Sequence, residues 1–327
     1  MLKEISIEII RKCPNKCLHC SSFSDESSTE ILDYDRFAAI VKDAAKMGAT
    51  TICLSGGEPF LHSKISDMIE LVASLGLNSY VYTCGIMLDK ENGSVSINKS
   101  ILKDISSNVT KLIFNIEAAT SDIYDEIMGT TDCFEKMKQS ACDANKLGIT
   151  TEAHFVPMKL NVDEVDAVIG LCKELKISRL SFLRLVLHGR AQENEALIAM
   201  SDNELEKFKT VLVELKERSE VDIRIGVPLS TDKSCHKCEA ATGKLNIRYD
   251  GNVFPCEVFK NDSLSHCLNG TNPESIYEKS LLEIYQNSGY LNMARDLSKD
   301  FLCKNDCETC IGQYLINKDG INNGEQR

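Results

Sequence analysis

Three cysteines near the start of the chain have the spacing of a metal-binding loop. Cys13, Cys17 and Cys20 lie together in the stretch CPNKCLHC. Three thiolates on one loop can hold three irons of a cubane cluster and leave the fourth iron open to a ligand. Zinc is the alternative, but zinc sites usually combine paired C-x2-C or Cys/His sets. No obvious fourth ligand accompanies these three cysteines, so their spacing favours an iron–sulfur cluster.

A second group of cysteines gathers in the last hundred residues. A hairpin signal lies within this region. Asp250-Gly251 stands between two short apolar runs and predicts a tight turn. The turn at Gly251 would return Cys256 to the segment that holds Cys235 and Cys238. Five further cysteines are scattered in apolar surroundings, which is typical of small buried side chains. A zinc knuckle is the alternative for the C-terminal group, which consists of Cys235, Cys238, Cys256, Cys267, Cys303, Cys307 and Cys310.

Composition limits the class of protein. The chain has 327 residues, 43% of them hydrophobic and 26% charged, with a formal net charge of -12. This balance disfavours disorder and a nucleic-acid-binding surface. No apolar run approaches the roughly 20 residues of a membrane span, and the N-terminus lacks the features of a signal peptide. We therefore expect a cytoplasmic protein, in which thiols stay reduced and structural disulfides are rare.

Strands and helices alternate through the first two-thirds of the chain. Expected helices end at Gly48, Gly76 and Gly148, where glycine can take the left-handed conformation, and an apolar strand follows each. Such alternation predicts parallel strands joined by right-handed crossovers. About six units fit, which predicts an α/β fold with a partial (β/α)6 TIM-like barrel. The expected strands are 5–10, 51–54, 79–83, 112–117, 150–156 and 180–185.

The alternation stops after Val221, where a loop-rich and cysteine-rich region begins. We place the domain boundary near residue 228, with a barrel domain at 1–228 and a small C-terminal cysteine-rich domain at 229–327. The first cysteine loop directly follows the first strand. In a barrel of parallel strands it would lie at the C-terminal rim, where active sites form.

The spacing C-x3-C-x2-C resembles the signature loop of the radical S-adenosylmethionine (SAM) superfamily. His19 stands where an aromatic ring normally precedes the last cysteine. The second strand ends in Ser55-Gly56-Gly57-Glu58-Pro59, which is similar to the family's Gly-Gly-Glu-Pro motif. The resemblance implies that these residues bind SAM. The glycines would let the backbone approach its methionine part, and Glu58 would accept from its ammonium group.

Other segments extend the resemblance along most of the chain. Tyr82-Thr83-Cys84-Gly85 stands where the family often has Thr-Asn-Gly, and Asn115 and Glu117 stand where it places polar residues that reach the SAM ribose. Arg184 resembles a residue at the end of the sixth strand, which implies cofactor contact and a part in catalysis. The alternative for Arg184 is a structural ion pair. For His154, on the fifth expected strand, the alternative to a functional role is a core histidine with satisfied hydrogen bonds.

The C-terminal cysteines resemble the SPASM and Twitch extensions of this superfamily, which carry auxiliary [4Fe–4S] clusters. Cys238, Gly251 and Cys256 fit the opening C-x9–15-G-x4-C, whereas the usual C-x2-C-x5-C-x3-C continuation is absent. The resemblance implies one auxiliary cluster, with two as the alternative, and Cys267 is a spare cysteine, a ligand or a catalytic thiol. The implied auxiliary ligands are Cys235, Cys238, Cys256, Cys303, Cys307 and Cys310.

The resemblance also implies an activity. A [4Fe–4S] cluster on Cys13, Cys17 and Cys20 would cleave SAM to methionine and a 5′-deoxyadenosyl radical, which takes a hydrogen atom from the substrate. SPASM and Twitch proteins most often modify peptides, so we expect cross-linking, epimerisation or dehydrogenation of a peptide or small protein. Implied partners are such a substrate, including a leader-bearing precursor, and an electron donor such as flavodoxin or ferredoxin, without nucleic acid or membrane.

Some alternatives stay open at this point. Because the first cysteine lies at position 13, we expect no peptide-recognition domain in front of it. A leader would then bind another surface or a separate partner. One alternative activity is dehydrogenation or rearrangement of a small molecule. Another class is a non-enzymatic iron–sulfur or zinc scaffold, which the Gly-Gly-Glu-Pro motif disfavours because a cluster carrier needs no methionine-binding turn.

Overall fold

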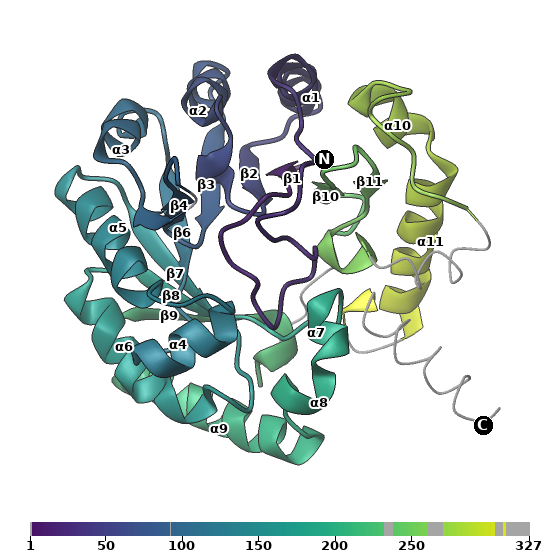
Figure 1. Cartoon of the computed structure of the whole chain (residues 1–327). Coiled ribbons are helices and arrows are strands. Elements are labelled where there is room, and N and C mark those ends of the chain that lie inside the picture. The colour runs from purple at the N-terminus through teal and green to yellow at the C-terminus, as the bar shows by residue number, and fades with distance from the viewer. Residues whose placement is uncertain (1, 92, 232–237, 261–270, 305–309, 312–327) are drawn as a thin grey trace.

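A curved sheet of mostly parallel strands forms the inner wall of an open barrel, and helices cover its outer face (Figure 1). The structure is a computed structural model that describes residues 2–91, 93–231, 238–260, 271–304 and 310–311. In this part of the chain nine strands follow the order β11-β10-β1-β2-β3-β6-β7-β8-β9. Neighbours pair in parallel except β10 and β11, which are antiparallel. The strands are β1 (Glu4–Ile10), β2 (Thr51–Gly56), β3 (Asn78–Thr83), β6 (Lys111–Asn115), β7 (Thr151–Phe155), β8 (Arg179–Phe182), β9 (Asp222–Ile225), β10 (Lys244–Ile247) and β11 (Val253–Phe254).

Most helices connect successive strands, whereas α10 and α11 follow the last strand. A separate small hairpin, β4 (Ile86–Leu88) and β5 (Ser94–Ser96), follows β3 and was not predicted from the sequence. The helices are α1 (Tyr34–Lys46), α2 (Ile65–Ser74), α3 (Lys99–Ile105), α4 (Ser121–Met128), α5 (Phe134–Lys146), α6 (Val165–Glu174), α7 (Arg190–Glu193), α8 (Glu195–Ile198), α9 (Asp202–Arg218), α10 (Leu281–Asn287) and α11 (Gly289–Lys304).

Helix α1 shows why the outer layer forms where it does. The Asp33 side chain accepts a hydrogen bond from the Arg36 backbone N–H and caps the first turn. Phe37 and Val41 lie one turn apart and are buried against the sheet. Gly48, with a φ of 84°, ends the helix, as the sequence predicts. The next strand therefore begins within one short turn of the helix end.

The six predicted barrel strands are confirmed, and the two ends of the sheet add more. The fourth predicted strand ends at Asn115 and the sixth at Phe182, so Glu117 and Arg184 lie beyond regular strand. Strand β9 pairs in parallel with β8 as a further barrel strand. At the other edge, the predicted hairpin forms around Gly251, whose φ is 82°, and its strand β10 pairs in parallel with β1. The C-terminal region thus continues the barrel sheet, whereas the boundary near residue 228 stays a prediction.

The inner wall of the barrel is polar. Alternate residues of each strand point inward, and a cavity of about 570 Å³ occupies the lumen. Ser6, Tyr82 and His154 are among the side chains that line it. The apolar core lies instead between the outer face of the sheet and the helices, with Ile7, Leu54 and others fully buried there. This arrangement leaves the lumen free to hold a polar molecule.

Candidate active site

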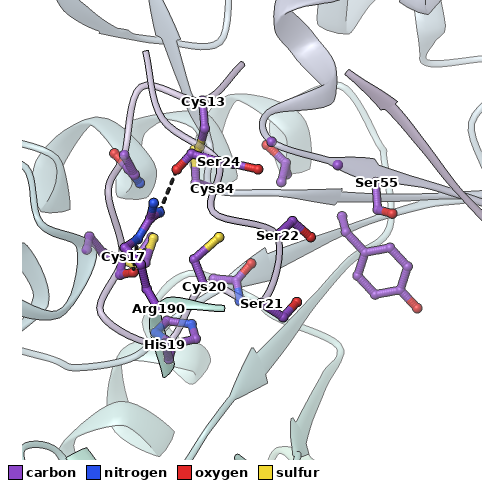
Figure 2. Close-up of a pocket in the computed structure, with 17 residues that line it drawn as sticks. Cys13, Cys17, His19, Cys20, Ser21, Ser22, Ser24, Ser55, Cys84 and Arg190 are labelled. Atoms are coloured by element: carbon purple, nitrogen blue, oxygen red, sulfur yellow. Dashed lines mark hydrogen bonds between the residues drawn. The ribbon is translucent and has the colours of Figure 1, made fainter. Parts of the chain in front are cut away.

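The first cysteine loop lies at the C-terminal end of the barrel strands. Cys13, Cys17 and Cys20 line one cavity of about 230 Å³ (Figure 2). The loop is fixed from outside, because Lys16 N–H donates to the Met128 carbonyl at 3.0 Å and Leu18 N–H to the Ile127 carbonyl at 2.8 Å. Both carbonyls belong to the end of α4 and are free to accept, because the last carbonyls of a helix have no partner within it.

The Gly-Gly motif packs against this loop through its backbone. Gly57 N–H donates to the Ile10 carbonyl at 2.6 Å, and Glu58 N–H donates to the Lys12 carbonyl at 2.9 Å. A Cβ atom on Gly56 would lie 2.1 Å from the Ile10 carbonyl oxygen, and one on Gly57 would lie 2.1 Å from that of Lys12. Both glycines also line the cavity. Their lack of a side chain is therefore needed to seat the cysteine loop, in addition to the predicted approach to a ligand.

Arg190 holds the other side of the loop. Its Nε donates to the Cys17 carbonyl at 3.0 Å and its Nη2 donates to the Ser24 carbonyl at 2.5 Å, a contact drawn in Figure 2. The Arg190 backbone N–H also donates to the Cys20 carbonyl at 2.9 Å. A buried guanidinium that satisfies carbonyls on both sides of the cysteines fixes the path of the loop.

Glu58 does not line the cavity. Its carboxylate is fully buried and accepts from Thr83 Oγ1 at 2.9 Å, the Cys84 N–H at 2.8 Å and the Phe60 N–H at 3.0 Å. Burial raises the pKa of Glu58 to about 7, and the hydrogen bonds from Cys84 and Phe60 oppose that rise. The side chain therefore ties the end of β3 to the motif, and its expected contact with an ammonium group stays a prediction. Pro59 is likewise buried and begins a 3₁₀ turn over Pro59–Leu61.

His19, Asn115 and Glu117 form a connected group. His19 and Asn115 line the cavity, and Glu117 is fully buried behind them. Glu117 Oε1 lies 3.4 Å from His19 Nε2 and accepts from Asn115 Nδ2 at 3.3 Å. Burial raises the pKa of Glu117 to about 7 and lowers that of His19 to about 4. Two of the three predicted residues thus face the cavity, and the third orients them.

The residues around the cavity suit a polar cofactor bound beside a cluster. Both polar atoms of the Asn15 amide and Nδ1 of His19 are buried without a hydrogen-bond partner among the described residues. Both side chains line the cavity. Because buried polar groups are rarely left unpaired, these atoms fit a site completed by a bound molecule. The three thiols supply the soft ligands that an iron–sulfur cluster takes.

The C-terminal cysteines are only partly described. Cys238, Cys256 and Cys310 interact electrostatically. Burial raises the pKa of Cys238 and Cys256, and the negative charge of Cys310 raises it further, together with that of Glu257 for Cys256. Backbone N–H groups of Ala240 and Val258 donate to the sulfurs of Cys238 and Cys256. Cys235, Cys267 and Cys307, and the side chain of Cys303, lie outside the described residues.

Arg184 lies away from the cysteine loop. It lines the lumen cavity and a groove of about 490 Å³ on the outer side, and it is absent from the lining of the 230 Å³ cavity. Strand β8 ends at Phe182, so Arg184 follows the strand, and its predicted contact with the cofactor stays a prediction. His154, in contrast, faces the lumen, with its ring 5.3 Å from that of Tyr82.

Sequence reasoning missed several residues of the cavity. Arg190 was not among the predicted site residues, although it fixes the cysteine loop. Asn15 and Met128 line the cavity without any prediction. Cys84, noted only as a replacement for Asn, lines it beside Cys13 (Figure 2) and donates its thiol to Glu58 at 2.9 Å. Asn15 lies inside the cysteine motif, and this position was the available signal.

Residues 7–191, more than half of the chain, match the family profile described as "Radical SAM superfamily". The chain belongs to the radical SAM superfamily. Membership implies a [4Fe–4S] cluster and SAM, which agrees with the thiol loop and the unsatisfied polar atoms beside it. Residues 235–311 match a second profile, SPASM, described as an iron–sulfur cluster-binding domain. The family resemblance and the C-terminal extension predicted from the sequence are both confirmed.

Curated relatives include two proteins named PqqA peptide cyclase. That of Rhizobium meliloti is 25% identical over 88% of this chain and 74% of its own length, and that of Ruegeria pomeroyi is 26% identical over 87% and 76%. Solved structures with the same fold include Streptococcus suis SuiB bound to S-adenosylmethionine, at 16% identity and a TM-score of 0.73, covering 91% of this chain and 68% of SuiB. Native anSMEcpe with bound AdoMet has 17% identity and a TM-score of 0.67, covering 91% and 84%.

None of the described helices combines the length and the apolar character that crossing a bilayer requires.

Proposed function

We propose that this radical SAM enzyme modifies a peptide or small protein, by cross-linking, epimerisation or dehydrogenation, in the cytoplasm. The observation that carries the proposal is that three cavities adjoin one another. Ser55 and Tyr82 line both the cysteine-loop cavity and the lumen, and Arg184 and Pro228 line both the lumen and the outer groove. An extended chain lying from the groove into the lumen would present a residue to a radical formed beside the cysteine loop. The curated relatives, named as peptide cyclases, support the same substrate class.

Each residue of the cysteine-loop cavity has a proposed part. Cys13, Cys17 and Cys20 hold the cluster, and SAM bound to it supplies the hydrogen-abstracting radical. The backbone at Ser55-Gly56-Gly57, together with His19 and Asn115, contacts SAM. These residues fix the position of the cofactor and exclude water from it. Glu58, Pro59 and Glu117 act from behind by holding β3, the motif and His19 in place.

The C-terminal region would hold one auxiliary [4Fe–4S] cluster. Cys238, Cys256 and Cys310 are its described ligands, and Cys235, Cys303 and Cys307 are the further candidates. The backbone N–H groups that donate to the sulfurs of Cys238 and Cys256 support this assignment, because such donors stabilise thiolate charge and tune a cluster's potential. Cys267 as a ligand or catalytic thiol, a second auxiliary cluster, and a domain boundary at residue 228 stay predictions. So does the electron donor, which would be a flavodoxin or ferredoxin.

A reconstitution experiment tests the proposal. The full chain is purified without oxygen, and iron, sulfide and 5′-deoxyadenosine are measured for the wild type and a Cys13/Cys17/Cys20→Ala variant. We expect about eight irons per chain, with about four kept and no SAM cleavage in the variant, because each cubane holds four irons. Near twelve irons would indicate two auxiliary clusters. Cys172→Ala, at a buried position on α6, is the matched control and should keep all activity.

The substrate class needs a second measurement. Candidate precursor peptides are incubated with the reconstituted enzyme, SAM and a reductant, and their masses and stereochemistry are compared before and after. A mass change or a change of configuration that depends on the cysteine loop supports peptide modification. SAM cleavage without any change in peptides, but with turnover of a small molecule, would contradict it.

A further inference from the structure

The lumen cavity carries more positive than negative charge, although the whole chain has a net charge of -12. Its wall includes three carboxylates and five lysines or arginines, contributed by different strands of the barrel and by the turn after Cys256. The carboxylates are those of Glu4, Glu152 and Glu257, and the cations are those of Lys111, Arg179, Arg184, Arg224 and Lys244. An excess of cations along the wall of this cavity favours an anionic ligand over a cationic one.

Most of these cations have a partner within the protein. Burial lowers the pKa of Lys244, whereas the negative charge of Glu257 raises it. The same two effects act on Lys260, which lies outside this cavity. In the part of the chain that the structure describes, the side chains of Arg184 and Arg224 form neither an ion pair nor a hydrogen bond. The pairs that do form are Lys244–Glu4 at 2.9 Å, Lys111–Glu152 at 2.8 Å and Arg179–Asp222 at 2.6 Å. Among the described residues, Arg184 and Arg224 therefore have no ion-pair partner, Arg224 is exposed to solvent, and Glu257 is the one carboxylate of the wall outside these three pairs.

The positive charges of the lumen also affect the pKa of the neighbouring histidine. Burial, followed by the charges of Arg224 and Lys111, lowers the pKa of His154 to about 3. His154 is therefore neutral at physiological pH and adds no charge of its own. It pairs in the sheet register with Asn115, which lines the cysteine-loop cavity. Arg184 and Arg224 thus line the cavity that adjoins the proposed site of radical formation.

The position of Arg184 bears on how a substrate would pass. Arg184 and Pro228 line both the outer groove and the lumen, so this arginine stands where the two cavities meet. Arg224 lies on β9, the strand added beyond the six predicted ones; it lines the lumen and is exposed to solvent. A chain lying from the groove into the lumen would contact Arg184 where the two cavities adjoin and Arg224 within the lumen. Arginine forms strong, geometrically defined pairs with carboxylates.

We propose that Arg184 and Arg224 form an anion subsite that binds a carboxylate of the peptide substrate and places the neighbouring residue beside the cofactor. The inference rests on the proposed function and adds to it the charge of the substrate. The subsite is separate from the cofactor contacts made by His19 and Asn115.

Binding of defined peptides to the reconstituted, SAM-loaded full chain tests this subsite by calorimetry at fixed salt. Ac-Gly-Glu-Gly-NH2 carries a side-chain carboxylate, Ac-Gly-Gln-Gly-OH a terminal one, and Ac-Gly-Gln-Gly-NH2 none. We expect at least one of the two anionic peptides to bind about tenfold tighter than the neutral one. The preference should fall to about twofold or less in an Arg184→Gln/Arg224→Gln variant. The exposed Arg218→Gln, on α9, is the matched control and should keep it.

A charge reversal keeps the test decisive if truncation disturbs folding. An Arg184→Glu/Arg224→Glu variant with an unchanged unfolding midpoint should prefer Ac-Gly-Lys-Gly-NH2. Equal binding of the anionic and neutral peptides by the wild type would overturn the subsite and leave peptide modification standing. A parallel loss of SAM affinity in the Gln variant would also overturn it, by making the arginines cofactor contacts. Binding of glutarate but of none of the peptides would overturn the peptide substrate itself.

Discussion

Cys13, Cys17 and Cys20 lie on one loop, whereas Cys238 and Cys256 come from segments on either side of the β10–β11 hairpin and Cys310 follows α11. The N-terminal loop is fixed by its backbone, since α4, the Gly-Gly motif and Arg190 all bond to its peptide groups. At the C-terminal site, backbone N–H groups donate to the sulfurs themselves. The first site is therefore shaped before any metal binds, and the second depends on tertiary packing to bring its ligands together.

This difference predicts that the two sites respond differently to the same kind of change. A substitution that disturbs backbone packing should damage the N-terminal site and leave the C-terminal one able to bind iron. Loss of a single C-terminal thiol should instead leave the fold of the apoprotein nearly unchanged. The residues that connect the two regions, Glu8 on β1 and Lys260 after Cys256, should affect both.

The largest effect is expected for Gly57→Ala. The added Cβ would lie 2.1 Å from the Lys12 carbonyl oxygen and 2.4 Å from that of Arg11, and backbone atoms cannot move aside as a flexible side chain can. We expect no iron at the N-terminal site and no 5′-deoxyadenosine, measured after anaerobic reconstitution. Gly170→Ala, within α6 and with nothing within 4 Å of its Cβ, is the control and should be neutral or stabilising. Normal SAM cleavage by Gly57→Ala would contradict a preformed loop.

The link between the two regions should come next. Lys260 Nζ pairs with Glu8 and lies 3.2 Å from Ser22 Oγ, whose hydroxyl donates to Glu8 at 2.9 Å. The Lys260 and Glu8 side chains are 10% and 3% exposed, so Lys260→Met leaves a buried carboxylate unpaired. We expect a loss of about 3–5 kcal/mol in the free energy of unfolding by urea. A Glu8→Gln/Lys260→Met variant should regain part of that loss.

A surface pair provides the comparison for that measurement. Lys173 and Glu220 are 61% and 75% exposed and lie 2.7 Å apart. Lys173→Met should cost less than about 1 kcal/mol, because exposed ion pairs contribute little. A cost for Lys260→Met no larger than that for Lys173→Met would mean that the buried pair does not join the two regions.

The pH dependence of stability should show a smaller effect from Glu58. Burial raises its pKa from the ordinary 4.5 to about 7 in the folded chain. The folded state therefore holds a proton that the unfolded state releases, so this contribution is full below about pH 4.5 and is lost as pH rises through about 7. Its magnitude is about 3 kcal/mol at most. Urea unfolding of the apoprotein between about pH 5 and pH 8 should show a flatter slope for Glu58→Gln. Equal slopes would place Glu58 in a more solvated site.

The smallest effect on stability is expected for Cys238→Ala. The thiol is only partly buried, so its removal should cost the apoprotein about 1 kcal/mol or less. After reconstitution, however, the variant should lose the iron of the C-terminal site and keep SAM cleavage at the N-terminal one. Loss of SAM cleavage together with the C-terminal iron would show that the two sites are assembled jointly.

Sequence patterns predicted those features of the fold that depend on residues close together in the chain. The six barrel strands and the turn at Gly251 were correct, because alternation of apolar residues and the backbone freedom of glycine act over a few residues. Strand β9 and the pairing of β10 with β1 were missed, since β10 joins residues that lie about 240 positions apart in the chain. The pairing of distant edges leaves no periodic signal in either segment.

The site shows the same division. The cysteine spacing and the Gly-Gly motif identified the cavity, but they did not predict the surroundings of three acidic or basic residues. Glu58 and Glu117 are fully buried and accept hydrogen bonds from Cys84 and Asn115, which line the cavity. Arg184 lines both the groove and the lumen, and the ligand contacts predicted for all three stay predictions. Only the path of the backbone after each strand decides which way such a side chain points.

The sequence by itself determined the barrel, the cysteine loop that follows its first strand and the hairpin that opens the C-terminal region. Each of these follows from residue type and spacing within a short segment, where propensity and turn chemistry act directly. The tertiary structure alone decided that Arg190 fixes the loop, that Lys260 reaches Glu8, and that Arg184 and Arg224, without an ion-pair partner among the described residues, line the lumen. Those outcomes depend on burial and on charges brought together from distant segments, and neither quantity exists until the chain has folded.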